Sequence, residues 1–438
     1  MSPLNRAIGL PAATALVVGT IIGSAIFVQA SEITALVPSP PAVVLAWAVA
    51  GALTLIGALV CAELASAYPR TGGVYVFLKE IYSPALGFLW GWAMFWTMHS
   101  GILAAIATVF ARYTGYFVPL DDTGTRAVAM GAIIVLSAVN YLGVRFGSGL
   151  QSAFTVVKVA AVMAIIAIGW ALSGAPVAET AAAPAAAVTA GNFMLAVGAG
   201  LFAFGGWHMV TYTAEETVNP TRTIPRSLMI GVVVVTLCYI GLNAIYLRVL
   251  SVDTVIASSR VAADTFDVLM GSGGGSAISA LVMFSAFGAL NGIVMVGPRV
   301  YYQMSQDGLW FKWAGHLHPQ FQTPGRAIVL QAVWSSVLVL TGTYRALFTR
   351  VIYTEWIFFA LLALGVVLLR RRPGYQPAWR MPLVPLAPIL FVLASAAIVF
   401  NQVRADLTNS AIGLAIVASG IPAYYLWSRR RPIAPEAR

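Results

Sequence analysis

Long apolar runs dominate the sequence and constrain its fold more than any other feature. A helix needs about 20 consecutive apolar residues to cross the hydrocarbon core of a bilayer. With 60% hydrophobic and only 9% charged residues, the chain also lacks the roughly 25% of charged residues that cover a soluble domain. We therefore expect an all-α integral membrane protein in which residues 1–438 form one transmembrane domain with twelve spans. The predicted spans are about 11–36, 41–68, 84–118, 126–144, 149–173, 191–213, 227–250, 275–305, 326–343, 347–369, 381–402 and 410–427.

The basic residues predict the orientation of these spans. Loops on the cytoplasmic side carry an excess of lysine and arginine. With the N-terminus inside, 17 of the 25 basic residues lie at the cytoplasmic ends of the spans, seven lie at the opposite ends, and Lys158 lies within a span. Both termini are thus predicted to be cytoplasmic, and the net charge of +10 reflects membrane orientation, with no nucleic acid partner expected. The 17 residues are Arg6, Arg70, Lys79, Arg145, Arg222, Arg226, Arg299, Lys312, Arg326, Arg370, Arg371, Arg372, Arg380, Arg429, Arg430, Arg431 and Arg438.

Two spans differ from the others because glycine clusters interrupt their middles. Residues 19–25 read GTIIGSA in span 1, and residues 202–207 read FAFGGW in span 6. An offset of five spans reverses the orientation in the membrane, so the spans can form two inverted repeats, about 11–173 and 191–369, with accessory helices at about 381–427. The alternative is that Gly19 and Gly23 form a helix-packing motif with glycines four residues apart.

An interrupted helix exposes polar backbone groups in the middle of the bilayer. Such groups cost several kcal/mol each unless they find a partner, so they occur where a cavity or a ligand is present. A carboxylate can accept hydrogen bonds from free N–H groups, and an ammonium group can donate to free carbonyls. Paired glycine interruptions in two halves of a chain therefore point to a transporter site for a zwitterion.

At this point the chain resembles the amino acid–polyamine–organocation superfamily, and within it the L-type amino acid transporters, the light subunits of heteromeric exchangers and their bacterial relatives. The resemblance covers nearly the whole chain. It is carried by residues 19–27, by 202–226 (FAFGGWHMVTYTAEETVNPTRTIPR), by 243–250 (NAIYLRVL) and by 287–299. It implies a twelve-helix, five-plus-five inverted-repeat fold with broken helices 1 and 6 and a substrate amino acid bound between them.

The resemblance also implies roles for individual residues. The backbone N–H groups of Ser24 and Ala25 are expected to bind the substrate carboxylate, and the carbonyls of Ile21, Phe202 and Gly205 to bind its ammonium group. Phe202 resembles an aromatic gate over the substrate. Two positions depart from the family pattern, which usually has glycine at Ala25 and often asparagine at His208. The full set of predicted binding residues is Ile21, Gly23, Ser24, Ala25, Phe202, Ala203, Gly205, Trp207 and His208.

Lys158 is the only lysine within a predicted span. A charge at mid-membrane costs about 2.5–3.5 kcal/mol on insertion scales, so a functional role is the default expectation. In relatives, a lysine at this place resembles a built-in cation at the position that sodium occupies in sodium-coupled members, with Ser285 as a hydroxyl partner. We expect sodium-independent transport, with Lys158 either a fixed tether or a group that releases its proton; snorkelling to the interface is the alternative.

The sequence leaves two possible roles for each of the other polar residues in the spans. His208 follows the second cluster directly, so it either contacts the substrate or forms a neutral buried hydrogen bond, and His99 has the same choice. Glu215 and Glu216 either form a salt-bridged cytoplasmic gate or end a solvated helix. Glu355 is either an intramembrane functional carboxylate or an interfacial one.

The sequence thus predicts a plasma-membrane carrier, expected in a bacterial inner membrane, that exchanges small neutral L-amino acids by alternating access. Neutral substrates are favoured because neither glycine cluster contains an acidic side chain. The alternative is a proton-coupled importer of neutral, cationic or polyamine substrates; an amino acid sensor that does not transport is a more distant one. No enzymatic motif is present, and no metal or other cofactor is predicted.

The predicted partners are an amino acid substrate and membrane lipid. Cys61 and Cys238 both lie within spans, where burial is expected rather than a disulfide. Light subunits of the eukaryotic type use a cysteine in the loop after span 3 to bond a heavy chain, and residues 119–125 contain none. We therefore expect no disulfide-linked heavy chain, and a monomer or a non-covalent dimer.

Overall fold

The computed structural model describes residues 6, 8–23, 25–174, 188–341 and 344–428, with the backbone alone at 144–152, 272 and 344–352. All elements in this part of the chain are helical, apart from one isolated backbone bridge between Ile8 and Thr217. The elements are α1 (Leu10–Ile21), α2 (Ile26–Leu36), α3 (Pro40–Ala67), α4 (Val74–Ile81), α5 (Pro84–Ala93), the π-helix η1 (Met94–Met98), α6 (His99–Thr114), α7 (Asp122–Tyr141), α8 (Val144–Leu172), α9 (Ala190–Ala203), the 3₁₀ helix η2 (Trp207–Glu216), α10 (Pro220–Val249), α11 (Val252–Ala257), α12 (Val261–Met270), α13 (Ser272–Gln306), the 3₁₀ helix η3 (Lys312–Gly315), α14 (Gly325–Thr341), α15 (Tyr344–Leu369), α16 (Leu386–Ala405), α17 (Leu407–Ala418) and α18 (Gly420–Ser428).

The described residues contain nine helical stretches that are long and apolar enough to cross a membrane, or ten when the bent pair α1 and α2 is counted as one span. Two further apolar helices, at Gly325–Thr341 and Tyr353–Leu369, are shorter. The prediction of an all-helical, multi-pass membrane protein is therefore confirmed. The number of twelve spans stays a prediction.

Helix starts follow local chemistry more closely than hydropathy. Prolines occupy the first turns of α3, α5 and α10, where a missing backbone N–H is harmless and the fixed φ suits a helix. At α5 the Ser83 hydroxyl also accepts a hydrogen bond from the backbone N–H of Leu86 at 3.3 Å. Hydropathy placed the start of span 7 at about 227, whereas α10 begins at Pro220. The hydropathy pattern missed this start because the first two turns of α10 are polar.

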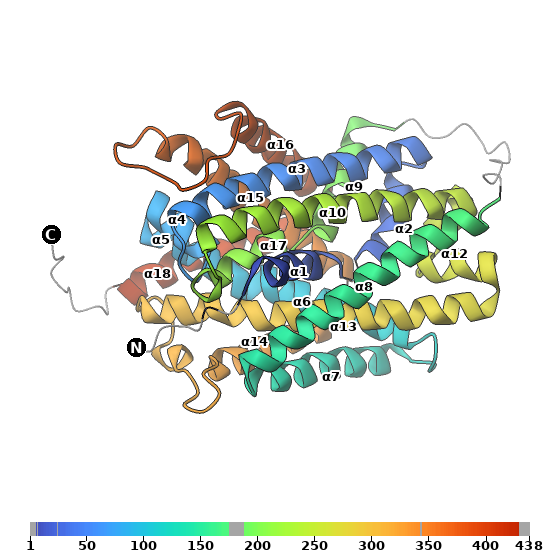
Figure 1. Cartoon of the computed structure of the whole chain (residues 1–438), viewed down its shortest axis with the longest axis horizontal. Coiled ribbons are helices and arrows are strands. Elements are labelled where there is room, and N and C mark those ends of the chain that lie inside the picture. Colours follow the sequence, from blue (N-terminus) through green and yellow to red (C-terminus); the bar gives the residue numbers. More distant parts are fainter. Residues whose placement is uncertain (1–5, 7, 24, 175–187, 342–343, 429–438) are drawn as a thin grey trace.

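The helices lie side by side along the long axis of the molecule (Figure 1). The segments 69–82, 307–325 and 370–385 lie at the end of the bundle that holds α4, α5 and α18, at the left of Figure 1. We call this the basic end, because these segments contain Arg70, Lys79, Lys312, Arg370, Arg371, Arg372 and Arg380. The segments 115–121 and 250–271 lie at the opposite end.

Short helices that the hydropathy pattern did not reveal organise the basic end. Helix α4 lies between the second and third predicted spans, and its Lys79 forms an ion pair with Asp307, at the end of α13, with 2.7 Å between Nζ and Oδ2. The Tyr75 hydroxyl donates to the same carboxylate oxygen at 2.6 Å. Arg372 donates to the carbonyl of Ile81 at 2.6 Å and so pairs one of the free carbonyls at the end of α4.

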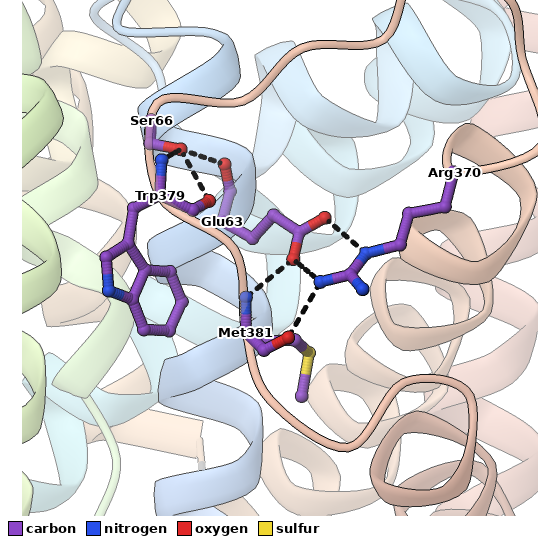
Figure 2. Close-up of polar contacts among 5 residues, drawn as sticks. All are labelled: Glu63, Ser66, Arg370, Trp379 and Met381. Carbon is purple, nitrogen blue, oxygen red and sulfur yellow. Dashed lines mark hydrogen bonds and ion pairs between the residues drawn. The ribbon is translucent and has the colours of Figure 1, made fainter.

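A buried carboxylate anchors the loop between α15 and α16 (Figure 2). Glu63, at the end of α3, has no exposed surface, and its two oxygens accept hydrogen bonds from Arg370 at 3.0 and 2.7 Å. Glu63 Oε2 also accepts from the backbone N–H of Met381 at 2.8 Å, while Arg370 donates to the carbonyl of Met381 at 2.7 Å. The hydrogen bonds to Glu63 raise the pKa of Arg370 above its ordinary value. The loop is thereby fixed to α3 at both of its ends.

We predict that Glu63→Gln destabilises this anchor, because an amide replaces a buried carboxylate that accepts three hydrogen bonds. Loss of charge-assisted bonds of this kind costs about 1–3 kcal/mol. The variant should melt at a lower temperature in detergent and be cleaved faster by trypsin within residues 370–380. Arg371→Gln, at an exposed neighbouring position, is the control for stability and should leave the melting temperature unchanged. Equal melting and cleavage of Glu63→Gln and wild type would contradict the prediction.

Candidate substrate site at two interrupted helices

Both glycine clusters interrupt their helices. Helix α1 ends at Ile21 and α2 begins at Ile26, with a bend of 48° between them. Helix α9 ends at Ala203, and after a turn the chain continues as the 3₁₀ helix η2 from Trp207. Contacts join α1 to η2 and α2 to α9, so the two interrupted helices lie antiparallel with their breaks at the same level.

The two breaks touch directly at Thr20 and Gly206. The Thr20 hydroxyl lies 2.8 Å from the carbonyl oxygen of Leu16 and 3.2 Å from that of Gly206. Gly206 has a φ of 97°, which favours glycine, and a Cβ added there would lie 3.0 Å from the Thr20 carbonyl oxygen. Both the backbone conformation and the close approach therefore require glycine at this position.

Tyr239, on α10, joins the last carbonyls of the two helices at the breaks. Its hydroxyl oxygen lies 2.9 Å from the Ile21 carbonyl oxygen and 3.0 Å from the Ala203 carbonyl oxygen. One hydroxyl proton can serve only one of them at a time, so the other carbonyl is left for a second donor. The phenol is fully buried among α1, α3 and α9, where its ring packs edge-on against Trp47 at 5.3 Å.

Lys158 and Ser285 reach the break of α1 from two other helices. Lys158, 1% exposed on α8, donates to the carbonyls of Gly19 and Ile22 at 2.8 and 2.9 Å. Ser285, on α13, lies at the longer distance of 3.4 Å from the carbonyl oxygen of Gly23. The ammonium group thus satisfies two carbonyls that the break releases. The two side chains predicted to act together lie at adjacent carbonyls, Ile22 and Gly23.

The start of α2 offers backbone N–H groups to the same space. The first N–H groups of a helix have no partner within the helix. The residue before α2 is Ala25, which is 7% exposed and provides no side-chain cap. Ser24, predicted to contribute the neighbouring N–H group, lies outside the described residues.

Small and aliphatic side chains surround the break of α1. A Cβ added at Gly23 would lie 3.3 Å from the Ala289 Cβ on α13 and 3.7 Å from the Ile106 Cδ1 on α6. Phe202, the predicted aromatic gate, is 7% exposed. The space beside the break is therefore narrow and apolar.

Trp207 and His208 are directed toward other helices. Trp207 packs against Gly57 of α3, whose added Cβ would lie 3.0 Å from the Trp207 ring, and against Phe359 of α15, with ring centroids 5.0 Å apart. His208 lies among the rings of Trp90, Tyr212 and Phe359, at centroid distances of 5.7, 5.5 and 4.9 Å. Both rings thus pack into a cluster of aromatic side chains that includes Phe359 of α15.

At the basic end, η2 terminates in a buried ion pair. Glu216 contacts Arg299 of α13 with 3.0 Å between Oε2 and Nη2, and both side chains are largely buried. The backbone carbonyl of Glu216 accepts a hydrogen bond from the N–H of Ile8 at 3.0 Å, while Glu215 is exposed. The ion pair connects η2 to α13 directly below the break in the second helix.

Sequence reasoning did not identify Thr20, Tyr239 or Arg299 as parts of this site. A hydroxyl at mid-membrane needs an acceptor, and an interrupted helix offers carbonyls that lack a donor within the helix. Tyr239, in the middle of an apolar span, carries that signal, but the pattern of one chain does not reveal which helix faces it.

The comparisons with known proteins identify the family. A family model described as amino acid permease matches residues 8–421. The chain belongs to the amino acid permease family. It is 31% identical over 433 residues to the serine/threonine exchanger SteT of Bacillus subtilis, covering 98% of each chain. It is also 29% identical over 432 residues to the human b(0,+)-type amino acid transporter 1, covering 97% of this chain and 88% of the relative. A further relative, the rabbit large neutral amino acids transporter small subunit 2, is 29% identical over 451 residues, covering 97% and 80%.

These matches confirm the resemblance that the glycine clusters suggested. The relatives are transporters and exchangers of amino acids rather than enzymes, and the chain is a multi-pass membrane protein of a transporter family. Amino acid transport is therefore the general function of this protein.

We predict that Lys158→Met abolishes substrate binding or transport while a folded protein remains. Methionine keeps the length and apolar surface of the side chain but cannot donate to the carbonyls of Gly19 and Ile22, which then lack a partner. Binding of labelled alanine by the purified variant is the measurement. Thr155→Val, which removes the hydrogen bond from α8 to the Ala15 carbonyl at 3.1 Å, is the matched control. Unchanged binding and transport by Lys158→Met would remove Lys158 from the mechanism.

Proposed function

We propose that this protein exchanges small neutral L-amino acids across the plasma membrane by alternating access and without sodium. The observation that carries the proposal is the meeting of two interrupted helices at Thr20 and Gly206, with Tyr239 within hydrogen-bond distance of the Ile21 and Ala203 carbonyls. Such a meeting brings the N–H groups at the start of a helix close to backbone carbonyls, each of which can accept a second hydrogen bond, and this suits a zwitterion.

In this proposal the substrate lies between α2 and the end of α9. Its carboxylate accepts hydrogen bonds from the backbone N–H groups of Ser24 and Ala25, where the positive end of the helix dipole also favours an anion. Its ammonium group donates to the carbonyls of Ile21, Phe202 and Gly205. The Ile21 carbonyl already has Tyr239 as a neighbour at 2.9 Å, so the substrate and Tyr239 compete for it.

The preference for small neutral substrates rests on the walls of the site. Ala289 and Ile106 lie close to Gly23, and the methyl group of Ala25 reduces the space further. A long or charged side chain would need room and polar partners that these residues do not offer. The similarity to an exchanger named for serine and threonine agrees with this choice. Gly23 and Ala203 contribute backbone to the site, and Trp207 and His208 support it from behind.

Lys158 supports the proposal that sodium is not required. Its ammonium group donates to two carbonyls of the α1 break at 2.8 and 2.9 Å. A fixed positive charge there repels a metal cation and supplies the charge that the cation would otherwise bring. Ser285 completes this arrangement at the Gly23 carbonyl.

The same proposal includes the architecture and its orientation. Twelve spans form two inverted repeats, about 11–173 and 191–369, with accessory helices at about 381–427. The basic end faces the cytoplasm together with both termini, in agreement with the positive-inside rule. The protein inserts without a disulfide-linked heavy chain, as a monomer or a non-covalent dimer.

The Glu216–Arg299 pair serves as the cytoplasmic gate in this proposal. It joins η2 to α13. Opening toward the cytoplasm separates them, so the pair must break once in each transport cycle. A buried pair of this kind resists separation because each charge would lose its partner.

Proteoliposomes test the transport mode directly. We expect labelled alanine to enter sodium-free vesicles loaded with unlabelled alanine or serine, and to enter empty vesicles or arginine-loaded vesicles much more slowly. Uptake into empty vesicles that depends on a pH gradient would replace exchange by proton-coupled import. Exchange against arginine at a similar rate would overturn the preference for neutral substrates. Specific binding of alanine without uptake under any of these conditions would contradict transport.

We predict that Glu216→Gln loosens the cytoplasmic gate and raises the exposure of the site from that side. A cysteine at Ala289, which faces Gly23, reports this exposure in a protein whose Cys61 and Cys238 are replaced by alanine. Labelling by a thiol reagent added to the cytoplasmic side should be faster in Glu216→Gln. Glu215→Gln, at the exposed neighbouring position, should label like the parent protein. Equal rates in both variants would show that the ion pair is not a gate.

A further inference from the structure

A groove between α7 and α14 lies on the outer surface of the bundle. It has a volume of about 680 Å³ and is lined almost wholly by apolar side chains of these two helices. Ile134, Val329 and Val333 line it and are 59%, 52% and 58% exposed, so the groove opens to the surroundings of the bundle. Its volume lies within the range of about 300–1,000 Å³ that is typical of small-molecule sites. In a membrane-spanning protein, the medium beside this groove is lipid.

The segments that form and flank the groove carry charged residues of one sign only, the positive one. The sequence has no aspartate or glutamate at 123–178 or at 308–354, which covers nearly all of α7, all of α8, the connection from α13 to α14, and α14 itself. Arg145, Lys312 and Arg326 lie in these segments near the basic end of the groove. The groove therefore favours a ligand with an anionic group at that end and an apolar chain along its length.

Arg326 is placed to act on an occupant of the groove. It stands three residues before Val329 and seven before Val333, so it continues the helix face that lines the groove. It is exposed, and it donates to the carbonyl of Trp313 at 3.3 Å. Trp313 is itself 44% exposed, as tryptophans at a membrane interface commonly are.

A second observation points to a polar group in the occupant. Ser137 lines the groove and is 7% exposed, yet its hydroxyl has no hydrogen-bond partner among the described residues. Tyr141, one turn nearer to the basic end, also lines the groove. A buried hydroxyl without a partner is unfavourable, and an ester carbonyl within the groove would satisfy it.

We propose that this groove binds an anionic phospholipid. The acyl chain lies between α7 and α14, an ester oxygen accepts the Ser137 hydrogen bond, and the phosphate lies at Arg326 and Lys312. The inference uses the surface of the bundle alone and does not depend on the proposed transport mode. A second copy of the chain, or a helix of another membrane protein, would need no phosphate partner at Arg326.

Native mass spectrometry of the detergent-purified full chain tests the proposal, with phosphatidylglycerol or phosphatidylcholine of the same acyl composition added. We expect wild type to retain phosphatidylglycerol preferentially. In Lys312→Gln/Arg326→Gln, the ratio of retained phosphatidylglycerol to phosphatidylcholine should fall by about five-fold for each basic residue removed. Ala332→Trp, which fills the groove, should retain less of both lipids. Arg371→Gln, an exposed arginine elsewhere at the basic end, is the matched control and should behave like wild type.

Several results would overturn the proposal. Equal retention of the two lipids by wild type would show that the groove has no preference for an anionic lipid. A loss of phosphatidylglycerol in Arg371→Gln as large as that in Lys312→Gln/Arg326→Gln would show a general effect of surface charge. Efficient cross-linking of Val333→Cys between two copies in bilayers would assign the groove to a dimer. Because Arg326 and Lys312 are exposed, their double variant should fold normally, which gel filtration checks, and the test does not depend on Ala332→Trp.

Discussion

Each backbone N–H or carbonyl group that a helix break releases inside the bilayer needs a hydrogen-bond partner, and this requirement organises the centre of the molecule. Lys158 partners the carbonyls of Gly19 and Ile22, and Tyr239 lies within reach of those of Ile21 and Ala203. Helices α8, α9 and α10 are thereby held around the break of α1. The backbone N–H groups at the start of α2 and the carbonyls at the end of α9 are the ones that we propose the substrate uses.

Ionic contacts at the basic end are of two kinds: some connect elements that stay together in the proposed mechanism, and one connects elements that separate. Glu63 fixes the loop after α15 to α3, and Asp307 fixes α4 to the end of α13. The Glu216–Arg299 pair instead joins the second interrupted helix to α13. In an alternating-access cycle the first two contacts can persist while the third must open. The proposed cycle thus concentrates its cytoplasmic opening at one buried ion pair.

Hydropathy predicted the membrane-spanning class and the approximate spans, because about twenty apolar residues in succession rarely form anything other than a transmembrane helix. It did not predict α4, α11 or α12, because these short helices lie between spans and depend on tertiary contacts such as Lys79–Asp307. The two glycine clusters, which are patterns along the chain, were identified from the sequence. Tyr239 and Arg299 were not, because their roles depend on which helices become neighbours. Trp207 and His208 were predicted from proximity along the chain; their rings pack against α3 and α15, and their contact with the substrate stays a prediction.

The central claim is that the two breaks together bind the substrate. A cryo-electron microscopy map of the protein in lipid nanodiscs saturated with serine tests it most directly. We expect density for serine between the start of α2 and the end of α9, with its ammonium group within hydrogen-bond distance of the Ile21 carbonyl. Serine density elsewhere, with the two breaks unoccupied, would contradict this.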